Sequence, residues 1–169
     1  MAKYKYIFGP VTSRCLGRSL GVNNIPCKTR TYSCIYCQLG RTSNYTTSRR
    51  GLYDWREVVM EVVDFTKKHG SEIDYVTFVP DGEPTLDVNL GKIIEKIKEE
   101  VDVKLAVLTN ASLLWLEDVR KDLELADFVS VKVDAVYESI WKRINRPHPQ
   151  LKLEDILLKK GEVNEERRS

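Results

Sequence analysis

Two cysteines separated by two residues are the groups of this chain best suited to metal or redox chemistry. Cys34 and Cys37 stand on a loop-rich stretch, and two thiolates at this spacing converge on one side of a turn. Zinc sites, thioredoxin-like redox sites and iron–sulfur clusters all use this spacing, and an inert pair is a further alternative. Cys27 precedes the pair on the same loop, and Cys15 lies farther back. The spacing predicts a metal or redox site and leaves its kind open.

A second candidate motif consists of Asp81, Gly82, Glu83 and Pro84, which follow an apolar run at residues 73–79. A carboxylate such as Glu83 suits an ammonium partner, because charge-assisted hydrogen bonds are strong. Glycine at position 82 allows the backbone to come close to a ligand. Proline, aspartate and glycine also favour turns, so a plain turn after a strand is the alternative. The position of the motif after a strand and a cysteine loop favours the binding site.

The elements that must position these motifs alternate along the middle of the chain. Helical patterns begin after a capping Asp54, and they cover residues 55–70, 90–97, 116–123 and 136–144. In the last helix, the expected apolar face consists of Val136, Ile140 and Ile144. After a loop-rich stretch to about Gly51, buried strands are expected at residues 73–79, 103–108 and 128–133. This series predicts an α/β fold with a parallel sheet, whose functional groups lie at the carboxyl ends of the strands.

Polar residues mark the ends of the later strands. Thr109 and Asn110 follow the run at 103–108. Alternation along residues 128–133 places three valines on the helix-covered face, and Ser130, Lys132 and Asp134 on the concave face. A buried lysine and a buried aspartate require a reason, which is either a ligand or a mutually satisfied pair. We therefore expect this end of the sheet to hold a site.

Composition sets the limits of the interpretation. The 169 residues are 42% hydrophobic and carry a net charge of +2, which predicts one core domain, residues 1–158, and favours no class of charged partner. Residues 159–169 form a charge-rich tail that we expect to be disordered. No signal peptide and no run of roughly 18 apolar residues is present, so a cytoplasmic location without a membrane partner is expected. Cysteines in that compartment stay reduced.

The cysteine loop, residues 13–22 before it and residues 81–86 after it together resemble a branch of the radical S-adenosylmethionine (SAM) superfamily. The resemblance extends over approximately residues 7–155. It implies a partial TIM-type (β/α) barrel, a parallel sheet with outer helices, in which a CxxxCxxC loop holds a 4Fe–4S cluster and the fourth iron binds SAM. Cys34 and Cys37 would be two ligands of that cluster, and Tyr36 would lie near the adenine.

The same resemblance assigns roles at the strand ends. It places the motif from Asp81 to Pro84 at the methionine amino group of SAM. The remaining residues of the strand ends would line the cavity for SAM and the substrate, with Lys132 and Asp134 as catalytic candidates: Thr109, Asn110, Ser130, Lys132 and Asp134. An electron donor such as ferredoxin or flavodoxin is also implied.

The chain departs from the pattern of that superfamily in two respects. Arg30 stands where the first cluster cysteine belongs, and arginine cannot ligate iron. We predict that Cys27 replaces it, which gives the metal set Cys27, Cys34 and Cys37; Cys15 is the poorer candidate. The chain also has room for only about half of a full barrel, which needs about 250 residues, so a truncated core is expected.

The predicted function is reductive cleavage of SAM to start radical chemistry on an unidentified substrate. Two alternatives are a small zinc-binding interaction module and a catalytically silent fragment. An RNA substrate is a weak further hint, from positive and aromatic residues near the cysteine loop: Arg41, Tyr45, Arg49, Arg50 and Tyr53. The strand at 128–133 would leave an open edge, so self-association is expected.

Overall fold

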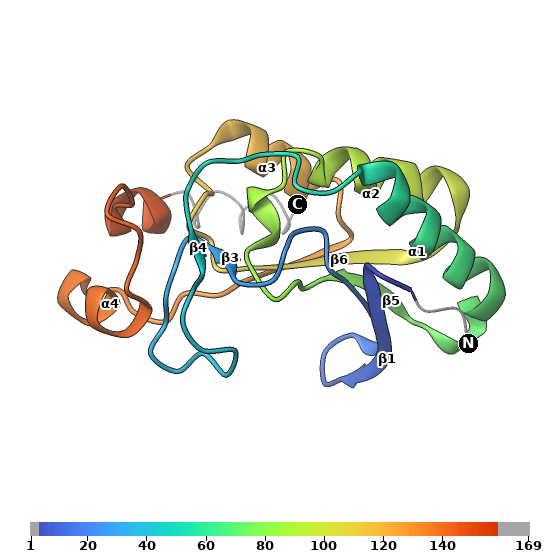
Figure 1. The fold of residues 1–169 in the computed structure, drawn as a ribbon, viewed down its shortest axis with the longest axis horizontal. Helices are drawn as coiled ribbons and strands as arrows, with labels where there is room; N and C mark the ends of the chain where they lie inside the picture. Colours follow the sequence, from blue (N-terminus) through green and yellow to red (C-terminus); the bar gives the residue numbers. More distant parts are fainter. Residues whose placement is uncertain (1–3, 159–169) are drawn as a thin grey trace.

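The computed structural model describes residues 4–158. Its core is a five-stranded sheet in the order β1-β2-β5-β6-β7, shown in Figure 1. Strands β2, β5, β6 and β7 are parallel, whereas β1 pairs with β2 in the antiparallel direction. The strands span β1 Ile7–Ser13, β2 Gly17–Val22, β5 Tyr75–Phe78, β6 Lys104–Thr109 and β7 Phe128–Val131. A separate two-stranded sheet consists of β3 Thr29–Arg30 and β4 Asn44–Tyr45.

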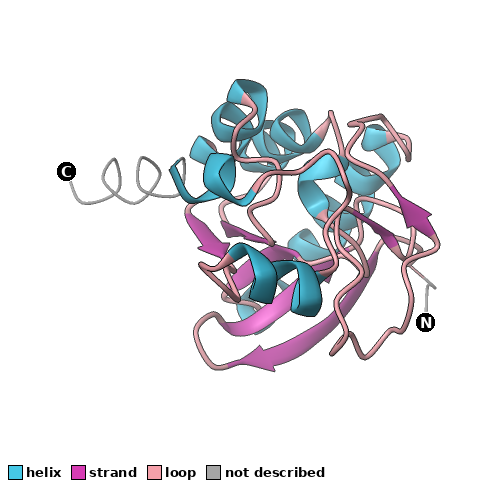
Figure 2. Cartoon of the chain, turned by 90° about the vertical axis from the view of Figure 1, so that its left-hand side faces the viewer, coloured by secondary structure: helices cyan, strands magenta, loops and turns pink. Residues whose placement is uncertain are grey.

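The helices follow the predicted pattern. The labelled helices are α1 Trp55–His69, α2 Leu90–Glu100, α3 Glu117–Glu124 and α4 Glu138–Asn145, with 3₁₀ turns at η1 Gly70–Glu72 and η2 Pro84–Leu86. Residues 153–158 are helical as well. Figures 1 and 2 show α1, α2 and α3 in a layer on one side of the strands, with α4 away from that layer. The predicted fold class, a partial barrel with a parallel sheet and outer helices, is confirmed, and β1 is its one antiparallel strand among the described residues.

Local sequence explains why the first of these helices forms where it does. The Asp54 side chain accepts a hydrogen bond from the Arg56 backbone N–H at 2.9 Å and so caps α1. Glu57 lies in the first turn and basic residues lie in the last, which complements the helix dipole. Val58 and Val62 are fully buried. The capping residue and the apolar spacing therefore fix both the start and the buried face of the helix.

The register of the parallel strands determines where the loops after them meet. Phe78 of β5 lies opposite Val107 of β6, and Thr109 of β6 lies opposite Val131 of β7. All three strands run in the same direction, so their carboxyl ends lie at one edge of the sheet. The loops at 79–83, 110–116 and 132–137 therefore lie side by side.

The amino-terminal hairpin of β1 and β2 was not predicted, because the sequence up to Gly51 was expected to be loop-rich. Most residues of β1 are exposed, and its register to β2 shifts between Phe8 and Val11, where the strand contains a cis Gly9-Pro10 bond. Such a strand has no buried alternation to detect. In the parallel part of the sheet, β5 and β7 are shorter than the expected ranges, and β6 has the expected length but begins one residue later. Strand β7 ends at Val131, before Lys132.

The apolar face predicted for the last helix was wrong. Val136 is 61% exposed and Ile140 is 38% exposed, whereas Trp141 and Asn145 are buried. Trp141 packs edge to face against Tyr32, with 5.9 Å between ring centroids. The helix is therefore oriented by a contact with the cysteine loop, which is remote in sequence.

The predicted charge-rich tail, residues 159–169, lies outside the described residues. The domain assignment of residues 1–158 stays a prediction. No helix within residues 4–158 has the length and apolar character needed to cross a bilayer.

Candidate functional site at the strand ends

A cavity of about 620 Å³ opens at the carboxyl ends of β5, β6 and β7. Most of the residues predicted to form a site line it: Cys34, Tyr36, Cys37, Gly82, Glu83, Thr109, Asn110, Ser130, Lys132 and Asp134. Arg30 and Tyr32 line it as well. Three predicted residues, Cys27, Asp81 and Pro84, are not among its lining residues. The parallel register thus brings together loops that lie about 100 positions apart in sequence.

Glu83 is the buried acid of this cavity, with a residue exposure of 2%. Its Oε1 accepts hydrogen bonds from the Thr85 hydroxyl at 2.6 Å, the Thr85 backbone N–H at 3.2 Å and the Thr109 hydroxyl at 2.6 Å. Its Oε2 accepts one bond, at 2.9 Å, from the Asn110 backbone N–H. Burial raises the pKa of Glu83, and these hydrogen bonds oppose that effect.

All of these donors are neutral. Within residues 4–158, no lysine, arginine or histidine forms an ion pair with Glu83. A buried carboxylate without a cationic partner is costly. Oε2 retains acceptor capacity, so a cationic ligand in the cavity could provide the missing charge.

Gly82 lines the cavity for a reason that differs from the expected one. A Cβ atom at this position would lie 2.4 Å from the Thr29 carbonyl oxygen and 2.7 Å from Ile25 Cδ1. The close approach that requires glycine is therefore to the chain's own β3 segment. Asp81 is exposed and contributes its backbone, since its carbonyl accepts from Lys28 N–H at 2.7 Å. Pro84 is buried at the start of η2, beneath the cavity wall.

The cysteine loop brings two thiols to the cavity. Cys37 Sγ accepts a hydrogen bond from Arg30 Nη1 at 2.7 Å, and Cys34 Sγ accepts one from Asn145 Nδ2 at 3.4 Å. Cys27 is exposed and lies outside the cavity lining. No group of three or more His, Cys, Asp or Glu side chains in the described part of the chain could hold a metal ion.

These residues therefore do not fit a cluster held by three cysteines. Arg30, which stands in place of the missing cysteine, occupies the cavity wall beside Cys37. The predicted metal set of Cys27, Cys34 and Cys37 stays a prediction, and it requires Cys27 to move to the cavity.

Tyr36 joins the cysteine loop to the end of β7. Its hydroxyl donates to the Asp134 carboxylate and accepts from Lys132 Nζ at 3.1 Å. Asn145 Nδ2 donates to the same hydroxyl at 3.2 Å and to Asp134 at 2.5 Å. The Lys132 ammonium also lies 4.3 Å from the centre of the Tyr36 ring. These four side chains form one polar cluster, of which Tyr36, Lys132 and Asp134 line the cavity.

The protonation states in this cluster follow from its contacts. Burial, and then the hydrogen bond to Asp134, raise the pKa of Tyr36. Burial acts to raise the pKa of Asp134 as well, but hydrogen bonds from Tyr36 and Asn145 and the charge of Lys132 outweigh it and lower that pKa. Tyr36 is therefore a neutral donor and Asp134 a carboxylate at neutral pH.

The expectation that Lys132 and Asp134 are both buried was wrong for the lysine. Its side chain is 58% exposed, whereas that of Asp134 is 21% exposed, because β7 ends before both residues. The alternative of a mutual ion pair is confirmed, with 3.5 Å between Lys132 Nζ and Asp134 Oδ1. Asn145 was missed because a lone asparagine at the end of a helix carries no signal in sequence.

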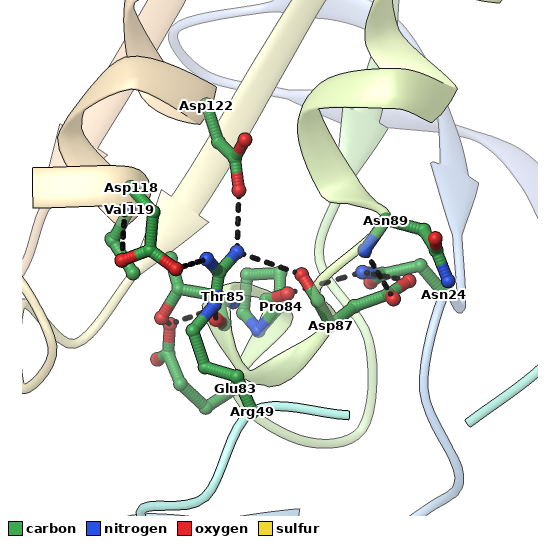
Figure 3. Close-up of polar contacts among 10 residues, drawn as sticks. All are labelled: Asn24, Arg49, Glu83, Pro84, Thr85, Asp87, Asn89, Asp118, Val119 and Asp122. Carbon is green, nitrogen blue, oxygen red and sulfur yellow. Dashed lines mark hydrogen bonds and ion pairs between the residues drawn. The ribbon is translucent and has the colours of Figure 1, made fainter. Parts of the chain in front are cut away.

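A buried arginine, Arg49, binds the backbone of the segment that follows Glu83 (Figure 3). The side chain of Arg49 is 8% exposed and donates to the backbone carbonyls of Thr85 at 2.8 Å and Asp87 at 2.9 Å. It also pairs with the carboxylates of Asp118 and Asp122 on α3. Arg49 therefore ties η2 to α3, and its charge is not presented to an external partner.

Burial raises the pKa values of two carboxyl groups near Arg49. Burial raises the pKa of Asp87 to about 6, against the hydrogen bonds from Asn89 and Asn24 and the charge of Arg49. Burial also raises the pKa of Asp122, against the hydrogen bond and charge of Arg49. The carboxyl groups of Asp87 and Asp122 are thus held in polar but mostly buried surroundings.

Comparisons with known proteins agree with the resemblance. A family model described as "Radical SAM superfamily" matches residues 27–159. The chain is 52% identical over 151 residues to UPF0026 protein MJ1312 of Methanocaldococcus jannaschii, covering 89% of this chain and 47% of that protein. It is 40% identical over 155 residues to a protein named GTPase Obg of Brachyspira hyodysenteriae, covering 92% of this chain and 23% of that protein.

The chain thus spans about half the length of the first relative and about a quarter of the second. Among solved structures, it is similar to archaeal TYW1, with a TM-score of 0.47 and 16% identity, over 84% of this chain and 50% of that one.

Proposed function

Because this chain belongs to the radical SAM superfamily, we propose that its strand-end cavity binds SAM, with Glu83 as the partner of the α-ammonium group. The observation that carries the proposal is a fully buried carboxylate that lines a cavity and has only neutral donors. An ammonium group on the ligand would supply the missing positive charge. It would also hold Glu83 in its carboxylate form, since a nearby cation favours the charged state.

The dimensions and lining of the cavity support a ligand of this kind. Its volume of about 620 Å³ lies within the range of roughly 300–1,000 Å³ of small-molecule sites. Tyr36, which also lines the cavity, is 46% exposed, and its ring offers a face on which an adenine can stack. Asn110 and Ser130 add polar groups to the lining. The pocket therefore combines an aromatic side chain with an acidic one, as a nucleoside joined to an amino acid requires.

Members of the superfamily generally combine SAM with a 4Fe–4S cluster. Reductive cleavage of SAM by this chain depends on such a cluster and stays a prediction, because the cavity offers it Cys34 and Cys37 but no third thiol among the described residues. Cys27 is the proposed source of that thiol. The proposed electron donor, ferredoxin or flavodoxin, depends on the same condition.

The substrate and the partners of the full-length protein are also proposals, given the partial coverage of the relatives. The RNA hypothesis loses part of its basis, because Arg49 is occupied by Asp118 and Asp122 and Tyr53 packs against Tyr6. Arg41 and Arg50 remain exposed. We keep RNA as a weakly supported proposal.

Isothermal titration with SAM tests the proposed site. We expect Glu83→Gln to weaken SAM binding at least tenfold, which is about 1.4 kcal/mol, because the neutral amide cannot form an ion pair with an ammonium group. Glu95→Gln, at an exposed position on α2, is the matched control and should leave the affinity unchanged. Thermal unfolding of both variants checks that the fold is retained. An unchanged affinity in Glu83→Gln would exclude this assignment.

A further inference from the structure

Arg30 lies on the cavity wall next to the backbone of Glu83. The Glu83 backbone N–H donates to the carbonyl of Thr29 at 3.1 Å, and Arg30 is the next residue in β3. Both Arg30 and Glu83 line the cavity. One positive and one negative side chain on adjacent, hydrogen-bonded segments therefore line the same pocket.

The guanidinium group is held in place by two neutral partners. Its Nε and Nη2 donate to the Asp81 carbonyl at 3.2 and 3.0 Å, and its Nη1 donates to Cys37 Sγ at 2.7 Å. These bonds use three of the five N–H groups of an arginine, so each Nη has one more hydrogen to donate. Within residues 4–158, no carboxylate forms an ion pair with Arg30.

A half-buried guanidinium with this arrangement is suited to one class of ligand. Two parallel N–H groups bind a carboxylate in bidentate fashion, and such pairs are stronger than neutral hydrogen bonds. The tether to Asp81 and Cys37 fixes the group before a ligand arrives, which lowers the entropy cost of binding. Glu83 meanwhile offers a carboxylate to an ammonium group.

We propose that Arg30 binds the α-carboxylate of the ligand whose ammonium group Glu83 holds, so that the cavity recognises a zwitterionic α-amino acid end through protein side chains. The inference rests on the proposed SAM site and deepens it. In this arrangement the residue that replaced a cluster cysteine has become a ligand-binding residue, and recognition of the amino acid end requires no metal.

The test compares two probes that differ only in the carboxylate, SAM and decarboxylated SAM. Both carry the adenosyl sulfonium group and an ammonium group. Isothermal titration of the full chain should show SAM binding at least tenfold more tightly than the decarboxylated probe. Arg30→Gln should weaken SAM binding at least tenfold and leave the affinity for decarboxylated SAM nearly unchanged. The variant would then no longer discriminate between the two probes. The ratio of the two affinities is internal to each variant, so a partly unfolded sample does not alter it.

Two further variants complete the design. Arg41→Gln, on the same loop, exposed and outside the cavity lining, should keep the discrimination. Glu83→Gln should weaken the binding of both probes by the same factor, since both carry the ammonium group.

The two hypotheses fail in different ways. If the wild-type chain binds both probes equally, or Arg30→Gln weakens both equally, the role of Arg30 is overturned and the SAM site stands. If the wild-type chain binds neither probe, the SAM site and the role of Arg30 are both overturned.

Discussion

The Thr109 hydroxyl, at the last position of β6, donates to the Glu83 carboxylate with 2.6 Å between Oγ1 and Oε1. This bond connects the end of one strand to the motif that follows its neighbour. Because Glu83 is fully buried and has no cationic partner among residues 4–158, each neutral donor carries a large part of its stabilisation. The ends of β5 and β6 are therefore coupled through one acidic side chain.

Thr109→Val should destabilise the chain, because it removes one donor from a buried carboxylate without changing the side-chain volume much. We expect a loss of about 1–3 kcal/mol in the free energy of unfolding, measured by urea denaturation. Thr109→Ser keeps the hydroxyl and is the matched control. Equal stability of the valine and serine variants would show that the bond contributes nothing.

Arg49→Met should be more damaging, since it leaves the Asp122 carboxylate, whose side chain is 19% exposed, without its cation. Removal of one member of a buried ion pair costs about 3–5 kcal/mol. Asp118→Asn, at a side chain that is 62% exposed, should cost about 1 kcal/mol or less. Urea denaturation compares the stabilities of the two variants. An Arg49→Met variant as stable as Asp118→Asn would contradict a stabilising role for the buried ion pair.

Asp87→Asn should alter the pH dependence of stability. Burial raises the pKa of Asp87 to about 6 from 3.8, so the folded chain binds a proton that the unfolded chain has lost between these values. Wild-type stability should therefore fall, relative to the Asn variant, as pH rises from about 4 to 6, and the difference should then stay constant. The expected size is on the order of 2–3 kcal/mol.

The Asn variant at position 87 can keep the hydrogen bond from the Asn89 N–H. Asn24 Oδ1, which is buried without a partner, can accept from the new amide if the Asn24 amide turns and gives up its bond to the Pro84 carbonyl. Asp74→Asn is a control of opposite sign. Hydrogen bonds from the backbone and side chain of Arg18 lower the pKa of Asp74, so that carboxylate stabilises the chain above its unfolded pKa and loses this effect as pH falls. Parallel pH profiles for wild type and Asp87→Asn would contradict the raised pKa.

Arg30→Cys should increase the iron held after anaerobic reconstitution, because it adds a third thiol at the cavity wall beside Cys37. We expect wild type to hold less iron per chain than this variant, measured by iron and acid-labile sulfide content. Cys27→Ala in the wild-type background tests the proposal that Cys27 is the third ligand. Loss of iron in that variant would support Cys27, and equal iron in wild type and Cys27→Ala would show that Cys27 is not a ligand.

The open edge of β7 should make the chain associate. Within the described residues, β7 pairs with β6 alone, whereas the other sheet edge, β1, contains Gly9-Pro10, which hinders strand pairing. Sedimentation velocity should show a mass that rises with concentration in the micromolar range. A constant monomer mass over that range would contradict the prediction.

The helices and parallel strands could be predicted because their signals are local. Val58 and Val62 mark the buried face of α1, and the apolar run before Asp81 marks β5. The same local reasoning failed for α4. Its buried residues, Trp141 and Asn145, are those that contact the cysteine loop. It also failed for β1, whose exposed residues have no alternating pattern.

The candidate side chains could be identified from residue type and spacing alone: the thiols of Cys34 and Cys37, the carboxylate of Glu83 and the unexpected arginine at position 30. Their contacts depend on the three-dimensional fold. It brought Thr109 to Glu83, buried Arg49 behind the loop and left Cys27 outside the cavity. The reason is that residue type is a local property, whereas burial and hydrogen-bond partners arise when parallel strands bring distant loops to one edge of a sheet.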